Sequence, residues 1–97
     1  MKLIEIEKEL TEYTEFNVQF SVDDVMNWLG EEYANVPEGE TVREGPFFKR
    51  KYGNNISISG NGEEFLKMPW WNKIKDKLYI ISKDDSADIW DIDFIDV

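Results

Sequence analysis

LYIISKDDSADIWDIDFIDV, residues 78–97, is the stretch that decides the fold. It contains two apolar runs joined by a polar turn at 83–88. In the second run apolar and acidic residues alternate, which places them on opposite faces of a strand: Trp90, Ile92 and Phe94 against Asp91 and Asp93. The pattern predicts two strands, the second with one face in the core and one face that carries negative charge.

The same stretch carries a ladder of carboxylates. Positions 84–97 hold six acids and no basic residue. Side chains two residues apart on a strand lie roughly 6.5–7 Å apart, because the rise is about 3.3 Å per residue. That is close to the step between phosphates along one nucleic-acid strand, about 3.4 Å of axial rise plus the winding. Such a strand suits a decoy for a phosphate backbone. The plainer interpretation is that the acids keep a sheet soluble and its edge unpaired.

Charge is unevenly spread over the 97 residues, whose net charge is −10. Residues 1–42 hold eleven acids and two lysines, residues 43–83 hold nine bases and four acids, and residues 84–97 hold acids alone. Two acidic ends therefore flank a basic middle. How these parts fold together decides which surface a partner meets.

Composition argues against several classes of function. We expect one domain over residues 1–97, with four Trp, four Tyr and six Phe to supply its core. The absence of Cys removes disulfides and thiolate metal sites, and the absence of His removes the commonest general base and zinc ligand. No apolar run reaches the roughly 20 residues of a membrane span, and no signal peptide opens the chain. We therefore expect a protein of a reducing cytoplasm.

The first third of the chain predicts two helices and a strand. Apolar residues at spacings of three and four predict helices over residues 2–13 and 22–33. Residues 15–21 alternate between apolar and polar, which predicts a strand. Ser21 and Asp24 have the spacing of a helix capping pair, so the second helix begins directly after that strand.

The middle of the chain predicts a loop and a hairpin. Residues 34–46 contain two Pro and two Gly and are interpreted as a surface loop. Residues 47–52 and 56–59 are interpreted as a β-hairpin around Gly53-Asn54-Asn55. Residues 63–68 predict a short helical turn before Pro69, and a strand follows at 78–82.

These elements together predict an α+β fold. We expect a mainly antiparallel sheet of four to five strands with one or two helices packed on one face, helix 22–33 among them. The outer face of the sheet would carry Asp91 and Asp93. The apolar members of the periodic patterns form the predicted core: Phe16, Val18, Phe20, Val25, Met26, Leu29, Trp90, Ile92 and Phe94.

Two groups of residues are candidates for binding a partner. The first is acidic and lies in the C-terminal stretch: Asp84, Asp85, Asp88, Asp91 and Asp93. The second is Trp71, which with Trp70 follows Pro69 and offers either an aromatic contact or a plug for the core. Residues 47–52 and 70–77 combine cationic and aromatic side chains, as proteins that bind single-stranded nucleic acid do. The net negative charge of the chain, however, repels polyanions.

Neither catalysis nor metal binding is expected. Asp84, Ser86 and Asp88 resemble the opening of a calcium loop, but Ile89 and Ile95 stand where its glycine and bidentate glutamate would be. No glycine-rich phosphate loop is present, and the adjacent carboxylates Asp84 and Asp85 are expected to point apart, so neither an enzyme nor a cofactor is indicated.

The hypothesis that follows is a small acidic inhibitor that binds a protein with a basic nucleic-acid-binding surface, without binding nucleic acid or membrane itself. Phage proteins that block host nucleases or CRISPR effectors, and immunity proteins that neutralise nuclease toxins, are similar in size, acidity and lack of catalytic residues. The likeness is one of type and transfers no residue; it would place the protein in a microbial cytoplasm. The alternative is a non-catalytic assembly module that uses an aromatic patch and an exposed strand edge. The oligomeric state stays open.

Overall fold

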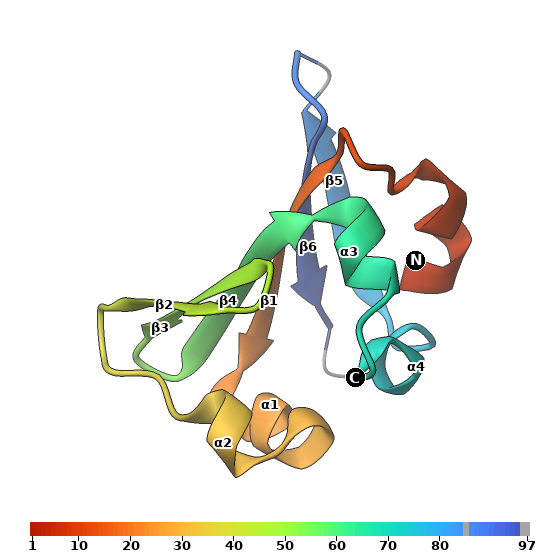
Figure 1. Ribbon diagram of the computed structural model, residues 1–97. Helices are drawn as coiled ribbons and strands as arrows, with labels where there is room; N and C mark the ends of the chain where they lie inside the picture. The colour runs from red at the N-terminus through yellow and green to blue at the C-terminus, as the bar shows by residue number, and fades with distance from the viewer. Residues whose placement is uncertain (85, 96–97) are drawn as a thin grey trace.

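The computed structural model describes residues 1–84 and 86–95. Its centre is a six-stranded sheet with the strand order β2-β3-β4-β1-β6-β5. The strands are β1 (Glu15–Ser21), β2 (Thr41–Glu44), β3 (Phe47–Tyr52), β4 (Asn55–Asn61), β5 (Tyr79–Asp84) and β6 (Ile89–Phe94). The helical segments are η1 (Leu3–Glu9), α1 (Val22–Leu29), α2 (Glu31–Ala34), α3 (Gly62–Leu66) and α4 (Trp71–Ile74) (Figure 1). The α+β fold class predicted from the sequence is confirmed.

The sheet is mixed and larger than predicted. β1 lies at its centre and pairs antiparallel with β4 and parallel with β6, while the other neighbouring strands pair antiparallel. The sixth strand, β2, lies within residues 34–46, which were predicted to form a loop. Its four residues are too few to show alternation, and the turn at Gly45 folds them back onto β3, with Glu44 opposite Phe47.

The strand predictions around this sheet are otherwise close. β1 occupies residues 15–21 as predicted, and β3 and β4 form the predicted hairpin, with Tyr52 opposite Asn55. Gly53 adopts a φ of 56° in the two-residue turn, a backbone conformation that glycine reaches without steric cost. β5 and β6 form the two predicted C-terminal strands.

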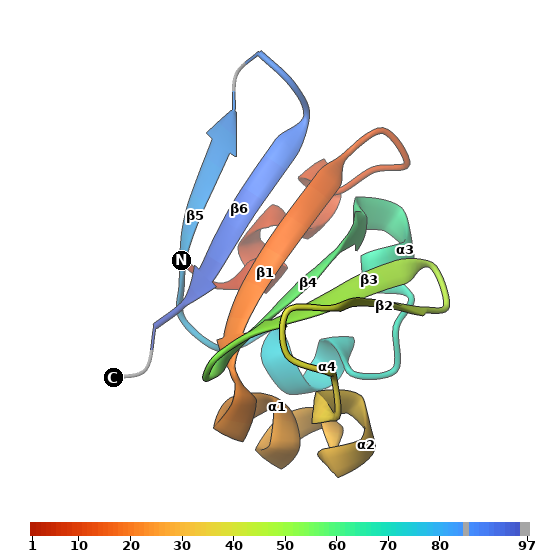
Figure 2. The ribbon, with the colours of Figure 1, turned by 90° about the vertical axis from the view of Figure 1, so that its left-hand side faces the viewer.

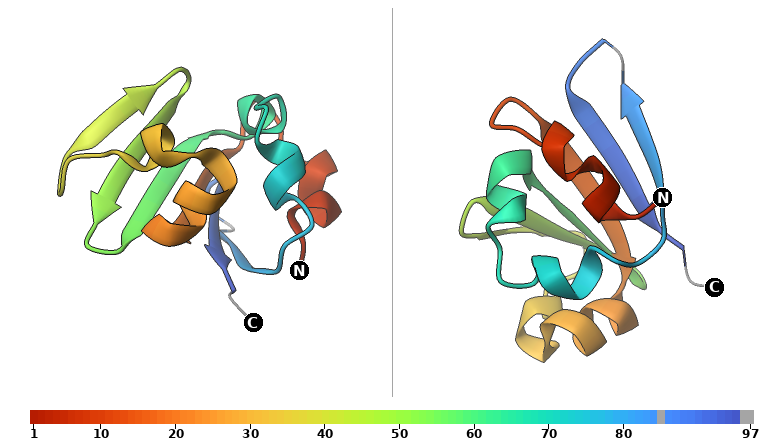
Figure 3. Two further views of the ribbon diagram at one scale, coloured as in Figure 1. Left: turned by 90° about the horizontal axis from the view of Figure 1, so that it is seen from below. Right: turned by 90° about the vertical axis from the view of Figure 1, so that its right-hand side faces the viewer.

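Helices cover one face of the sheet and leave the other bare. η1, α3 and α4 lie over one face, and α1 and α2 lie at the end of the sheet where β1 finishes (Figures 1 and 3). The predicted helix 22–33 is broken at Gly30, whose φ of 103° is incompatible with a continuous helix. The two resulting helices, α1 and α2, lie at the end of the sheet. The prediction that helix 22–33 lies across a face of the sheet is therefore wrong. The predicted helix 2–13 is a shorter 3₁₀ segment.

The core lies between the helices and the face of the sheet that they cover. Phe65 of α3 is fully buried, and its ring lies 4.1 Å from that of Phe16 and 5.1–5.2 Å from those of Trp70 and Trp71, measured between centroids. Six of the nine predicted core residues are buried: Phe16, Val18, Phe20, Val25, Trp90 and Ile92. Phe94 and Leu29 are partly buried.

Met26 is exposed, so its predicted burial is wrong. The helix that carries it stops at Leu29 and touches the end of the sheet through a narrow stripe, which includes the buried Val25. A side chain one position further round the helix then points to solvent.

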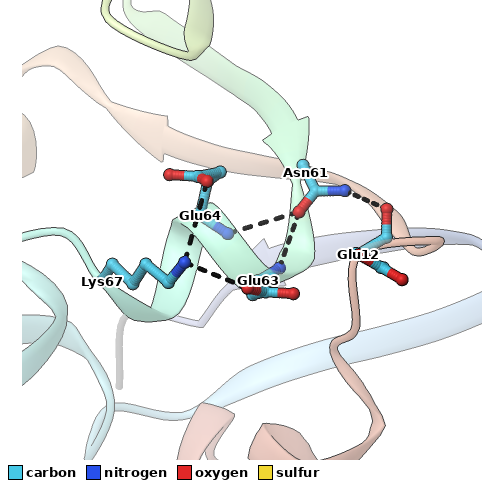
Figure 4. A network of polar contacts seen from close by, with 5 residues as sticks. All are labelled: Glu12, Asn61, Glu63, Glu64 and Lys67. Carbon is cyan, nitrogen blue, oxygen red and sulfur yellow. Dashed lines mark hydrogen bonds and ion pairs between the residues drawn. The ribbon is translucent and has the colours of Figure 1, made fainter.

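A cap joins β4 to α3 and fixes the position of the buried Phe65. The Asn61 side-chain oxygen accepts hydrogen bonds from the backbone N–H groups of Glu63 and Glu64 at 3.0 and 3.3 Å (Figure 4). Its amide nitrogen donates to the Glu12 carbonyl, which ties the loop before β1 to the same point. An Asn at a helix N-terminus satisfies backbone donors that would otherwise have no partner. The short helix α3 therefore begins at a defined place on the sheet.

The buried phenol of Tyr79 should make the stability of the fold depend on pH in the alkaline range. Its side chain is buried, and its hydroxyl donates to the Ile74 carbonyl at 2.9 Å. Burial raises the pKa of the Tyr79 phenol above its ordinary value, and the charge of Asp24 raises it further. The unfolded state loses this proton first, so the stabilisation is present below about pH 10 and is lost as the pH rises.

Thermal unfolding measured from pH 8 to pH 11 should show this loss. The melting temperature of wild type should fall steeply above about pH 10, and that of Tyr79→Phe should fall less steeply. Tyr13→Phe, which alters an exposed phenol, is the control. Equal slopes for wild type and Tyr79→Phe would contradict the assignment.

Candidate functional site

One face of the sheet has no helix over it (Figure 2). We call it the open face. Its side chains lie in rows that the strand register defines. One row runs across Arg50, Ser57, Gln19 and Asp93, and the next runs across Phe48, Ser59, Asn17 and Asp91. Each row thus passes from an arginine or an aromatic ring, through uncharged polar side chains, to an aspartate.

The acidic end of the open face is formed by β5 and β6. We call it the β5–β6 surface, and it consists of Ile80, Ser82, Asp84, Ile89, Asp91 and Asp93. Asp91 and Asp93 are exposed and lie on the outer face, as predicted. Within the described part of the chain neither makes an ion pair. Their neighbours in β1 are the uncharged Asn17 and Gln19, so the two charges are not neutralised locally.

The turn between β5 and β6 holds the other predicted acids. The Ser86 hydroxyl and backbone N–H donate to one oxygen of Asp84, at 2.7 and 2.9 Å, and these bonds lower the pKa of the Asp84 carboxyl. Asp88 lies 3.6 Å from the ammonium group of Lys83. Asp85 lies outside the described residues. Asp84 therefore adds to the acidic surface at all but strongly acid pH, whereas Asp88 is partly neutralised.

Two exposed isoleucines accompany these acids. Ile80 is 59% exposed and lies opposite Asp93 in the β5–β6 register, and Ile89 is 38% exposed and shares the open face with Asp91. Contact with water does not stabilise an apolar side chain that is exposed on a strand. Apolar groups beside charges are the usual composition of a protein contact, in which the apolar part is desolvated and the charges orient the partner.

The opposite end of the open face is aromatic and cationic. We call it the aromatic–arginine surface, and it consists of Arg43, Phe48, Arg50 and Tyr52. Phe48 and Tyr52 are 47% and 49% exposed, and the guanidinium carbon of Arg50 lies 4.9 Å from the centroid of the Tyr52 ring. Strand alternation puts Phe48, Arg50 and Tyr52 on one face of β3, but the sequence does not show that this face is the bare one.

A shallow hollow lies between the two ends of the open face. Uncharged residues such as Asn17, Ser57 and Ser59 line it, with Phe48, Arg50 and Glu15 at its margins. The Ser57 hydroxyl donates to the side-chain oxygen of Asn17. The middle of the face is therefore polar, uncharged and built from mostly short side chains.

The basic middle of the sequence does not form one patch. Strand alternation sends Phe47 and Lys49 to the helix-covered face, where both are buried, and sends Phe48 and Arg50 to the open face. Trp70 is also buried. The cations and rings of residues 47–52 and 70–77 are thus divided between the core and the surface, which removes most of the stacking platform considered from the sequence.

Trp71 is a buried core residue. It is 6% exposed, and its ring contacts that of Phe65 at 78° between planes. A ring in this position offers almost no surface to a partner, so the contact predicted for Trp71 is replaced by the core role. The aromatic patch of the alternative hypothesis would have to be Phe48 and Tyr52.

Two kinds of feature are absent from residues 1–84 and 86–95. No group of three or more acidic residues there is placed to hold a metal ion. No helix in the same residues is long and apolar enough to cross a membrane.

Comparison with known proteins gives no family. No protein-family model matches the sequence. Neither the curated proteins nor the solved structures gave a significant match.

Proposed function

We propose that the chain is an acidic inhibitor that binds a cationic, nucleic-acid-binding surface of another protein through the β5–β6 surface. The observation that carries the proposal is the pair Asp91 and Asp93, exposed on a bare sheet face and without an ion pair among the described residues. Carboxylates at a strand spacing of roughly 6.5–7 Å match the step of a phosphate backbone. Lys and Arg side chains that hold phosphates would hold these carboxylates in the same way.

The surroundings of this pair support a protein as the partner. Ile80 and Ile89 add apolar area that a lysine- and arginine-rich groove with apolar walls would cover. Arg50, the nearest exposed cation along the same row of the open face, lies three strands away, about 14 Å, which exceeds the Debye length at physiological salt. The field of the β5–β6 surface is therefore negative, and it would speed the approach of a cationic partner.

The test is a pull-down from a microbial lysate in which Asp91→Asn and Asp93→Asn are combined. We expect the double variant to capture the partner at least about tenfold more weakly than wild type, because each rim charge contributes to the rate of association. The partner should be a nucleic-acid-binding protein that added DNA or RNA displaces. Glu7→Gln combined with Glu9→Gln removes the same charge from exposed positions of η1, on the covered side, and should leave capture unchanged.

The outcomes separate the acidic surface from non-specific charge effects. Equal losses in both double variants would mean that only net charge matters, and the proposed site would be wrong. A partner that nucleic acid does not displace would contradict the inhibitory mechanism. Unchanged melting temperatures would confirm that the variants report on binding, since Asp91 and Asp93 face solvent.

A further inference from the structure

We infer that the open face also binds a second copy of this chain, in a symmetric dimer with the two sheets stacked face to face. The inference uses the whole open face and does not depend on the proposed target. Four exposed large apolar side chains lie on this face, Ile80 and Ile89 at one end and Phe48 and Tyr52 at the other. Both ends therefore carry apolar area that solvent does not favour.

The strand order makes the two ends of the open face complementary in charge. In the order β2-β3-β4-β1-β6-β5, a two-fold axis along the strands and between β4 and β1 exchanges β3 with β6 and β2 with β5. The cationic end of one copy then lies over the acidic end of the other. The alternative axis, across the strands, would place like charges over each other.

The register gives the pairs that face each other. Arg50 and Asp93 belong to one row, because each is linked through Ser57 and Gln19 to the same level of the sheet. An axis along the strands preserves that level, so Arg50 of one copy lies opposite Asp93 of the other, twice in the dimer. Within one copy the two residues are separated by about 14 Å and cannot pair.

The dimensions of the open face limit the area that the dimer can bury. Five inter-strand spacings of about 4.8 Å give a width of about 24 Å, and six residues give a length of about 20 Å. Stacking two such faces buries roughly 1,000 Å² in total, the lower limit for a specific interface. The charge of −10 on each copy opposes association. We therefore expect a weak dimer, with half-association on the order of 10–100 µM.

The dimer covers the β5–β6 surface, so self-association and capture of a cationic partner exclude each other. At high concentration the acidic surface of one copy is occupied by the aromatic–arginine surface of the next. A partner must displace that contact, and dilution frees the surface. The open face would thus be covered in the dimer at high concentration and exposed when the dimer dissociates on dilution.

Charge reversal tests the dimer with the isolated chain. Arg50→Glu places a carboxylate opposite Asp93, and Asp93→Arg places a guanidinium opposite Arg50. Each variant alone should raise the concentration for half-association at least about tenfold in sedimentation or light scattering. A mixture of the two variants should dimerise again, because one contact joins the two new charges and the other joins the native Arg50 and Asp93.

Controls keep the result specific to the open face. Lys73→Glu and Asp76→Arg make the same charge changes at exposed positions in and just after α4, on the covered side, and should leave association unchanged. Phe48→Ser, which keeps every charge, should also weaken the dimer. A wild type that stays monomeric to about 1 mM, or a mixture that does not recover, would overturn the inference. If the open face binds another protein instead, the wild type would stay monomeric and would capture that protein through Arg50. Because no target is present, failure here would leave the proposed inhibition standing.

Discussion

Replacing Phe65 by alanine should destabilise the fold by about 3–5 kcal/mol, which is a large part of the stability of a small domain. The ring is fully buried and contacts three aromatic neighbours, Phe16, Trp70 and Trp71. It belongs to a helix of five residues, which has no stability of its own and is held to the sheet by this side chain and the Asn61 cap. Its loss would leave a cavity between sheet and helices.

Urea unfolding followed by tryptophan fluorescence measures this effect. Phe48→Ala is the matched control, since it removes the same ring from the open face, where the side chain is 47% exposed. We expect that substitution to change the free energy of unfolding by no more than about 0.5 kcal/mol. Similar losses for the two variants would mean that α3 does not pack on the sheet as described.

Strict alternation explains why several strands were predictable. In β1 and in residues 90–94 of β6 apolar and polar residues alternate strictly, and a shift by one residue would expose the apolar set. The β3–β4 hairpin is similarly determined by a short turn that contains Gly53. Local sequence therefore decided both the existence of these strands and their inward faces.

The pairing of distant strands was not predictable from local patterns. The parallel contact of β1 with β6 joins residues that are more than seventy positions apart, and nothing in either strand names the other. Such a pairing arises from global packing, which a single sequence does not display. The break of the predicted helix at Gly30 is instead a local signal, because glycine commonly ends a helix.

The candidate site divides in the same way. The exposure of Asp91 and Asp93 followed from alternation, and the structure places both as predicted. The burial of Trp71 and the bareness of the face that carries Phe48 depend on where α3 and α4 lie. The polarity of the open face, with arginine at one end and aspartate at the other, required the strand order and could not be read from the chain.

Reversing the charge of Lys49 should lower the free energy of unfolding by about 3–5 kcal/mol. The burial of this lysine is a feature that the sequence alone does not predict. Lysines on strands are usually solvent-exposed, yet Lys49 is only 2% exposed. Its ammonium group donates to the Tyr33 carbonyl at 2.9 Å, pairs with Glu44 and lies 4.1 Å from the centroid of the Tyr33 ring. The buried charge is therefore stabilised by a carbonyl oxygen, a carboxylate and an aromatic ring.

Lys49→Glu would bring a carboxylate against the Tyr33 carbonyl and Glu44, with no donor to satisfy it. Lys49→Met keeps the shape but loses the hydrogen bond to the Tyr33 carbonyl and the ion pair with Glu44. We expect it to lower the free energy of unfolding by only about 1–2 kcal/mol, because the half-exposed Glu44 can be hydrated. Lys73→Glu repeats the charge reversal at an exposed position of α4 and should change stability by no more than about 0.5 kcal/mol. Chemical unfolding of the three variants should show a loss of unfolding free energy that increases in the order Lys73→Glu, Lys49→Met, Lys49→Glu. If Lys49→Glu were as stable as Lys73→Glu, the ammonium group would have to reach water, and β3 would have to present its opposite face to the helices.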